Sequence, residues 1–142
     1  MNVEIKPTPG QEARTGWVVG QVTRELLGGR PAQAGGPLFS SFSGAALAAA
    51  REAAPHYARG MLYGRIPREW QEELAARGCV ALHCDERHLD AASARAIGKA
   101  GFGLMCYTVN TAMRASQLFD WGVDAICTDR IDEIAADFAA RV

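Results

Sequence analysis

Residues 101–127 read GFGLMCYTVNTAMRASQLFDWGVDAIC, and this stretch decides the fold class. An apolar run over 102–109 predicts a strand, and the helical spacing of apolar residues over 111–121 predicts a helix that ends at Gly122. A second short apolar run over 123–127 predicts another strand. A strand, a helix and a strand in succession are typical of a parallel sheet covered by helices.

The same alternation extends outward over the rest of the chain. Further strands are predicted at 2–6, 37–42, 57–63 and 79–84, and further helices at 11–27, 44–54, 68–77, 91–100 and 131–140. Residues 30–36 are predicted to form a Gly/Pro loop. Ser43 and Asp90 stand where N-caps are expected, and Gly78 and Gly101 stand where helices are expected to end.

Two α/β architectures are compatible with this pattern. One is an open doubly wound sheet, and the other is a (β/α)8 barrel of the TIM type. A complete barrel takes about 250 residues, so the 142 residues of this chain would form only part of one, with about five βα units. No linker or low-complexity segment interrupts the pattern, and residues 1–142 are therefore expected to form a single domain.

Composition excludes several classes of function. The chain has 15 basic and 16 acidic residues and a net charge of −1, so nucleic acid is not an expected partner. It contains no apolar run long enough to span a membrane, and residues 1–10 do not resemble a signal peptide. The four cysteines form no CxxC pair and have apolar neighbours, which indicates reduced thiols and a cytoplasmic protein.

Chemistry is expected at the carboxyl ends of the parallel strands. Glu4 and Lys6 alternate with apolar residues, so both project from the same side of the first strand. They would hold a divalent cation and a phosphate, or they would simply form an ion pair; spacing alone favours the ion pair. Tyr107 offers an apolar wall with a polar tip. His83 is more typical of a hydrogen-bonded structural histidine than of a catalytic base.

Several functional motifs are missing. The chain has no GxGxxG, GxxxxGK[ST], GxSxG or HExxH segment. These absences argue against a dinucleotide site, a P-loop, a hydrolase nucleophile elbow and a zincin.

Five segments together resemble one family. They are NVEIKP (2–7), PLFSSFS (37–43), VALHCD (80–85), YTVN (107–110) and WGVDAICTD (121–129). In this order and spacing they resemble the glycerophosphodiester phosphodiesterases, in particular the bacterial cytoplasmic glycerophosphoryl diester esterases. The resemblance covers essentially the whole chain.

The resemblance implies a fold, a reaction and a set of residues. The family folds as a (β/α)8 barrel and hydrolyses glycerophosphodiesters to glycerol 3-phosphate and an alcohol, using Mg²⁺ or Ca²⁺. By position in the motifs, Glu4 would be a metal ligand and Lys6 would bind the phosphate of the substrate. Phe42 and Tyr107 would border the glycerol pocket.

The resemblance is to the C-terminal part of the family barrel. The family's HRG segment, its acidic ExD pair and a second histidine precede the EIKP strand, and residues 1–142 contain none of them. We therefore assign no catalytic residue and expect weak metal binding and little or no activity from this chain alone. The alternative is a non-catalytic α/β module that at most binds phosphate. Open edges at strands 2–6 and 123–127 predict a homodimer or larger assembly.

Overall fold

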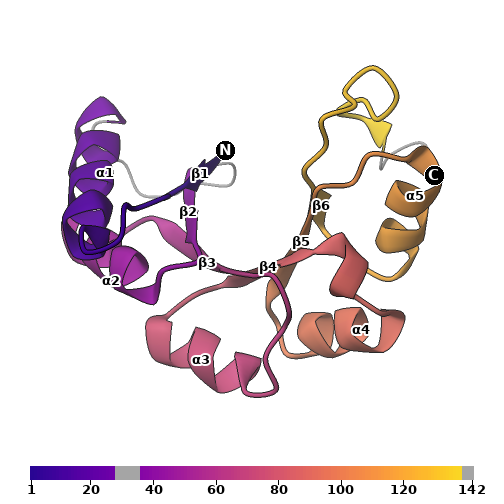
Figure 1. Cartoon of the computed structure of the whole chain (residues 1–142), viewed down its shortest axis with the longest axis horizontal. Helices are drawn as coiled ribbons and strands as arrows, with labels where there is room; N and C mark the ends of the chain where they lie inside the picture. Colours follow the sequence, from indigo (N-terminus) through magenta and orange to yellow (C-terminus); the bar gives the residue numbers. More distant parts are fainter. Residues whose placement is uncertain (28–35, 139–142) are drawn as a thin grey trace. The chain divides into compact units, whose positions relative to one another are not determined.

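Strands and helices alternate along the chain, as the sequence predicts (Figure 1). The computed structural model describes residues 1–27 and 36–138. The strands are β1 (Asn2–Glu4), β2 (Leu38–Ser41), β3 (Ala58–Tyr63), β4 (Ala81–Asp85), β5 (Gly103–Tyr107) and β6 (Ala125–Ile126). The helices are α1 (Glu12–Leu26), α2 (Gly44–Ala53), α3 (Trp70–Arg77), α4 (Ala91–Lys99) and α5 (Ala112–Asp120), with a single 3₁₀ turn, η1 (Glu86–His88), after β4.

The chain divides into two compact units. The first comprises Met1–Leu62 and Gln71–Val80, and the second comprises Tyr63–Trp70 and Ala81–Val142. In the first unit, β1 pairs with β2 and β2 pairs with β3, both in parallel. In the second unit, β4 pairs with β5 and β5 pairs with β6, again in parallel. The predicted parallel pairing is confirmed within each unit.

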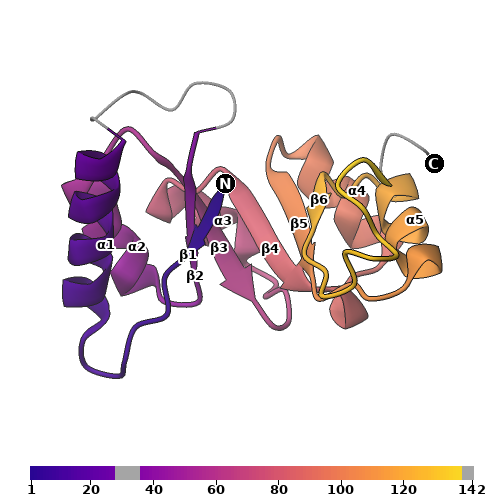
Figure 2. The same cartoon turned by 90° about the horizontal axis from the view of Figure 1, so that it is seen from above.

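Helices α1 and α2 of the first unit lie side by side on one face of its strands (Figure 2). Gly16 and Gly20 are one helical turn apart on α1 and are buried against α2. A Cβ atom at Gly16 would lie 2.8 Å from the backbone carbonyl carbon of Ala46, and one at Gly20 would lie 2.8 Å from the Cβ of Ala53. The two helices approach closely because small residues meet at these two contacts, Gly16 against Ala46 and Gly20 against Ala53.

Each unit has its own apolar core. The fully buried large side chains of the first unit include Ile5, Phe39, Leu47 and Leu74, and those of the second include Leu82, Ile97, Leu104 and Leu118. In β5 the burial alternates with period two, so Leu104 and Cys106 are buried while Gly103, Met105 and Tyr107 are partly exposed. Burying apolar surface of this kind is the main force that holds such units together.

The predicted helix ends are confirmed where the structure describes them. The Ser43 side chain accepts a hydrogen bond from the backbone N–H of Ala46, and Asp90 accepts one from Ser93. These contacts satisfy donors that have no partner inside α2 and α4. Beyond the helices, Gly78, Gly101 and Gly122 all have positive φ angles, a conformation that favours glycine.

One predicted helix is wrong. Residues 131–138 of the segment 131–140 form turns, and residues 139 and 140 lie outside the described residues. The side chain of Arg130 pairs with Asp132 and Glu133, two and three residues further on, and Phe138 donates to the carbonyl of Ala135, a three-residue turn. Only Ile134 is buried among residues 131–138, so the segment lacks the packed apolar face that stabilises a helix.

Strand boundaries differ from prediction more modestly. The first strand stops at Glu4, so Lys6 follows β1 instead of lying within it, and β6 covers two residues where five were predicted. Of the predicted loop 30–36, residues 30–35 lie outside the described residues, as do Gly28 and Gly29. No helix within residues 1–27 and 36–138 has the length and apolarity to cross a membrane.

Candidate functional site

Glu4 and Lys6 lie at the carboxyl end of β1, as predicted from their spacing. The Lys6 ammonium is 3.5 Å from a carboxylate oxygen of Glu4, and the two side chains are 78% and 33% exposed. Ile5, between them, is buried. This is the ion pair that spacing alone favoured. Because the pair is largely solvated, it contributes little to stability and leaves Lys6 able to meet an anion.

Two serines of β2 hold the ends of β1 and β2 together. The backbone N–H of Ile5 donates to the carbonyl of Ser40 at 2.7 Å. The Ser41 hydroxyl donates to the carbonyl of Ile5 at 2.7 Å and accepts from the N–H of Ser43 at 3.0 Å. Both serines are fully buried. The backbone beside Lys6 is therefore fixed before any ligand arrives.

A cavity of about 360 Å³ lies beside Lys6. The segment after β1 contributes Lys6, Pro7 and Pro9, the end of β2 contributes Ser41, Phe42 and Ser43, and Ile5 and Glu12 complete the lining. Phe42 is 55% exposed. The structure thus brings Lys6 and Phe42, two of the predicted site residues, to one cavity. Glu4 does not line this cavity, but its carboxylate pairs with the ammonium of Lys6, which does.

Tyr107 belongs to the second unit and ends β5. Its hydroxyl donates to the backbone carbonyl of Tyr63 at 2.8 Å, so the polar tip is held and the ring is left partly exposed. The peptide bond between Tyr107 and Thr108 is cis. Asp85 is the register partner of Tyr107 on β4.

Asp85 forms a two-point ion pair with Arg87. The Arg87 Nε lies 3.0 Å from Oδ1 and an Nη lies 2.6 Å from Oδ2. The hydrogen bond from Arg87 lowers the pKa of Asp85 to about 2, and nearby His88 adds a smaller effect in the same direction. Asp85 is therefore ionised, and both of its carboxylate oxygens are bound to Arg87. A carboxylate in this state has no proton to donate as a general acid.

His83 is buried in β4 and uncharged at neutral pH. It is 3% exposed, and burial lowers its pKa to about 4. Its Nδ1 atom has no hydrogen-bond partner in the part of the chain that the structure describes. Its burial fits the expectation of a structural histidine, but Nδ1 contributes no hydrogen bond to such a role among the described residues.

The YTVN and CTD segments contact one another in the second unit. The Asn110 side-chain oxygen accepts from the backbone N–H of Asp129 at 2.9 Å and from the Thr128 hydroxyl at 3.3 Å. The Asn110 amide nitrogen lies 3.4 Å from the Asp129 carboxylate. Asp129 thus joins two loops, in keeping with the turn role that the sequence favoured.

The cysteines are reduced, and three of the four are buried. Cys84 and Cys106 are register partners on β4 and β5, with their sulfur atoms 3.9 Å apart. The hydrogen bond with Cys84, together with burial, raises the pKa of the Cys106 thiol. Burial also raises the pKa of Cys79. Cys127 is exposed, and its sulfur lies 3.8 Å from that of Met105.

Sequence reasoning missed two features of the first unit. No sequence motif reveals that Ser41 joins β1 to β2. The contact is a hydrogen bond from the Ser41 hydroxyl to the carbonyl of Ile5, 36 positions earlier in the sequence. Two arginines, Arg51 and Arg77, line a second cavity. Their signal in the sequence is an arginine in the last turn of two successive helices.

Comparison with solved structures finds the same fold in several phosphodiesterases. A phosphodiesterase from Oleispira antarctica, solved in complex with the product sn-glycerol-3-phosphate, is 34% identical with a TM-score of 0.78, and the match covers 90% of this chain and 50% of that one. A glycerophosphodiester phosphodiesterase from Parabacteroides distasonis is 19% identical with a TM-score of 0.75, over 99% of this chain and 56% of that one. The corresponding protein of Thermotoga maritima is 20% identical with a TM-score of 0.66, over 92% and 54%.

These matches confirm the predicted fold class, an α/β chain of the (β/α)8 barrel type. The chain spans about half the length of the structures that it matches. A comparison with curated proteins found no significant match. Residues 1–133 match the model of the glycerophosphoryl diester phosphodiesterase family. The chain therefore belongs to the glycerophosphoryl diester phosphodiesterase family.

Proposed function

We propose that this chain supplies the phosphate-binding part of a site that hydrolyses glycerophosphodiesters to glycerol 3-phosphate and an alcohol. The observation that carries the proposal is the cavity beside Lys6, where an exposed ammonium and the apolar ring of Phe42 meet at the carboxyl end of parallel strands. The relative from Oleispira antarctica, solved with sn-glycerol-3-phosphate, supports a ligand of this class. In this proposal Lys6 binds a phosphate oxygen, while Phe42 covers the carbon skeleton of the glycerol.

The family's divalent cation, Mg²⁺ or Ca²⁺, fits the residues of this chain only in part. Such hard cations take six or more oxygen ligands, or a few carboxylates plus water. At the carboxyl end of β1 the chain offers one carboxylate, Glu4, already paired with Lys6. Residues 1–27 and 36–138 contain no group of three or more His, Cys, Asp or Glu side chains that is able to hold a metal ion. We propose Glu4 as one ligand of a metal site whose other carboxylate ligands are not supplied by residues 1–142, since residues 28–35 and 139–142 include no Asp, Glu, His or Cys.

We also propose that the chain alone does not turn over the substrate. None of its three histidines lines the cavity beside Lys6. His83 is buried and neutral, and His88 lies 2.9 Å from the carbonyl of Gly64 in the second unit. A missing general acid or base typically lowers the rate by about 10²–10⁴-fold. Purified chain with glycerophosphocholine and either Mg²⁺ or Ca²⁺ should release no glycerol 3-phosphate above background; measurable turnover would refute this part of the proposal.

Binding tests the phosphate role of Lys6 separately from catalysis. Titration with sn-glycerol 3-phosphate should shift the backbone amide signals of Lys6 and Glu12 in a ¹⁵N correlation spectrum. Lys6→Gln should weaken this binding by roughly three- to tenfold, because an exposed charged hydrogen bond is lost. Lys99→Gln, on α4 of the other unit, is the matched control and should bind like the unaltered chain. If Lys6→Gln and Lys99→Gln bind alike, Lys6 is not the phosphate-binding cation.

Self-association is the last part of the proposal. Among the residues that the structure describes, β1 pairs on one side only within the first unit, and β6 on one side only within the second. Unpaired backbone groups at such edges favour pairing with another chain. We expect a homodimer or larger assembly when molar mass is measured by light scattering at micromolar concentration. A monomer under these conditions would contradict the proposed assembly but leave the role of Lys6 untouched.

A further inference from the structure

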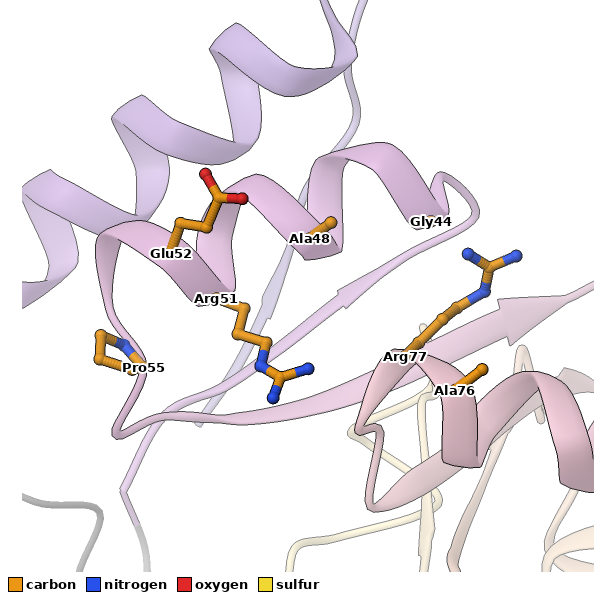
Figure 3. A pocket seen from close by; sticks show the side chains of 7 residues that line it. All are labelled: Gly44, Ala48, Arg51, Glu52, Pro55, Ala76 and Arg77. Atoms are coloured by element: carbon orange, nitrogen blue, oxygen red, sulfur yellow. The ribbon is translucent and has the colours of Figure 1, made fainter.

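A second cavity, of about 490 Å³, lies between α2 and α3 in the first unit (Figure 3). Arg51 comes from the last turn of α2 and Arg77 from the last turn of α3. Figure 3 shows both side chains reaching into the space between the two helices. Small residues such as Ala48 and Ala76 form part of the lining and leave room between the guanidinium groups.

The charge of these arginines is not neutralised. Within residues 1–27 and 36–138, neither Arg51 nor Arg77 takes part in an ion pair. Glu52 also lines the cavity, but Figure 3 shows its carboxylate turned toward α1 and away from both guanidinium groups. The cavity therefore presents two cations whose counter-ion is not supplied by these elements.

Arg77 lies against the first residue of α2. A Cβ atom added at Gly44 would stand 2.7 Å from the Cζ atom of Arg77, so the guanidinium occupies the space that a side chain would take. The start of a helix carries partial positive charge, and a guanidinium there is repelled. An anion bound beside Arg77 near the start of α2 would be attracted by both.

A third arginine lies beneath the cavity. Arg59, on β3, is 9% exposed and donates to the backbone carbonyls of Tyr57 at 2.8 Å and Gly78 at 2.9 Å. These partners are uncharged, so the positive charge of Arg59 persists. A Cβ position at Gly78 lies 3.2 Å from an Nη of Arg51 and 3.4 Å from an Nη of Arg59, so two guanidinium groups converge there. Burial and then the neighbouring Arg51 lower the pKa of Arg59, as expected in a positive field.

We propose that the cavity between α2 and α3 binds the phosphate group of inorganic phosphate or of a phosphate monoester through Arg51 and Arg77. Guanidinium groups bind phosphate oxygens through paired, charge-assisted hydrogen bonds, and here two of them face one cavity. The proposal is independent of hydrolysis and of Lys6, because the two cavities have no lining residue in common.

The experiment is a titration followed residue by residue. Inorganic phosphate should shift the amide signals of Gly78 and Ala76, and Arg51→Gln/Arg77→Gln should raise the dissociation constant at least tenfold. The matched control, Arg14→Gln/Arg95→Gln, removes two exposed arginines from α1 and α4 and should change it less than twofold. Thermal unfolding of each variant verifies that the fold is kept. Equal weakening in both double variants would show attraction to net charge alone and would overturn the proposal.

A second variant tests geometry at constant charge. Gly44→Ala places a methyl group where the Arg77 guanidinium lies and should displace that flexible side chain from the cavity. It should weaken phosphate binding severalfold although no charge is lost, and unchanged binding would contradict the placement of Arg77. Repeating the titration with sn-glycerol 3-phosphate distinguishes the two sources of phosphate: equal affinity indicates recognition of the phosphate alone, and tighter binding indicates a monoester. Lys6→Gln should leave the Gly78 response unchanged, which separates this site from the first.

Discussion

Gly16→Ala should destabilise the protein, whereas Gly98→Ala should stabilise it, although both replace a helical glycine by the best helix former. The Cβ atom at Gly16 would collide with the backbone of α2 at Ala46, so one helix has to move. Overpacking of this kind costs about 1–3 kcal/mol, and more when backbone atoms are in the way. At Gly98, in α4, no atom lies within 4 Å of the added Cβ. There the gain in helix propensity, roughly 0.5–1 kcal/mol, is not offset.

Urea unfolding of the two variants and the unaltered chain provides the measurement. The contrast in sign is the diagnostic result, because a general effect of alanine on helix stability would move both midpoints upward. If Gly16→Ala were as stable as Gly98→Ala, this result would contradict the close packing of α1 against α2.

Acidification below the ordinary histidine pKa should destabilise the protein through His83. The folded pKa of His83 is about 4 and its ordinary value is 6.5, so between these values the unfolded chain binds a proton that the folded chain does not. The free energy of unfolding that neutral His83 contributes is fully present above pH 6.5. It is lost as the pH falls from 6.5 toward the pKa of about 4 that His83 has in the folded protein. The difference corresponds to about 3 kcal/mol. The lowered pKa of Asp85, about 2, acts in a separate and lower range.

Unfolding free energies measured at intervals from neutral pH to about pH 4 check this expectation. His83→Gln cannot take up the proton and should give a much flatter profile over that range. His56→Gln changes an exposed histidine and should retain the steep profile of the unaltered chain. A steep profile that persists in His83→Gln would assign the acid sensitivity to another group.

The order of the elements could be predicted because local signals agree with the fold. Ser43 and Asp90 cap helices, and Gly78, Gly101 and Gly122 end them, each for a reason that lies within a few residues of sequence. The final helix was predicted wrongly because its apolar spacing is helical although only Ile134 of residues 131–138 is buried, so no apolar face is packed against the rest of the unit. Strand ends were overestimated for a related reason, since pairing with a neighbour, not composition, sets where a strand stops.

Only part of the candidate site could be predicted from the sequence. Period-two alternation is enough to place Glu4 and Lys6 together, and the structure shows the ion pair. The cavity beside Lys6 depends on Ser41 reaching the carbonyl of Ile5, a contact between distant segments that no local pattern reveals. The arginine cavity is hidden for the same reason: Arg51 and Arg77 stand 26 positions apart, and only the packing of α2 and α3 makes them neighbours.

Because three of the four cysteines are buried, Cys127 is the one cysteine exposed for chemical modification. Cys79, Cys84 and Cys106 are enclosed, and raised pKa values keep Cys79 and Cys106 protonated. Thiolate is the form that reacts with alkylating reagents, so maleimides should add to the native protein at Cys127. A spin label or fluorophore attached there would report on the end of β6 without any cysteine having to be engineered into the chain.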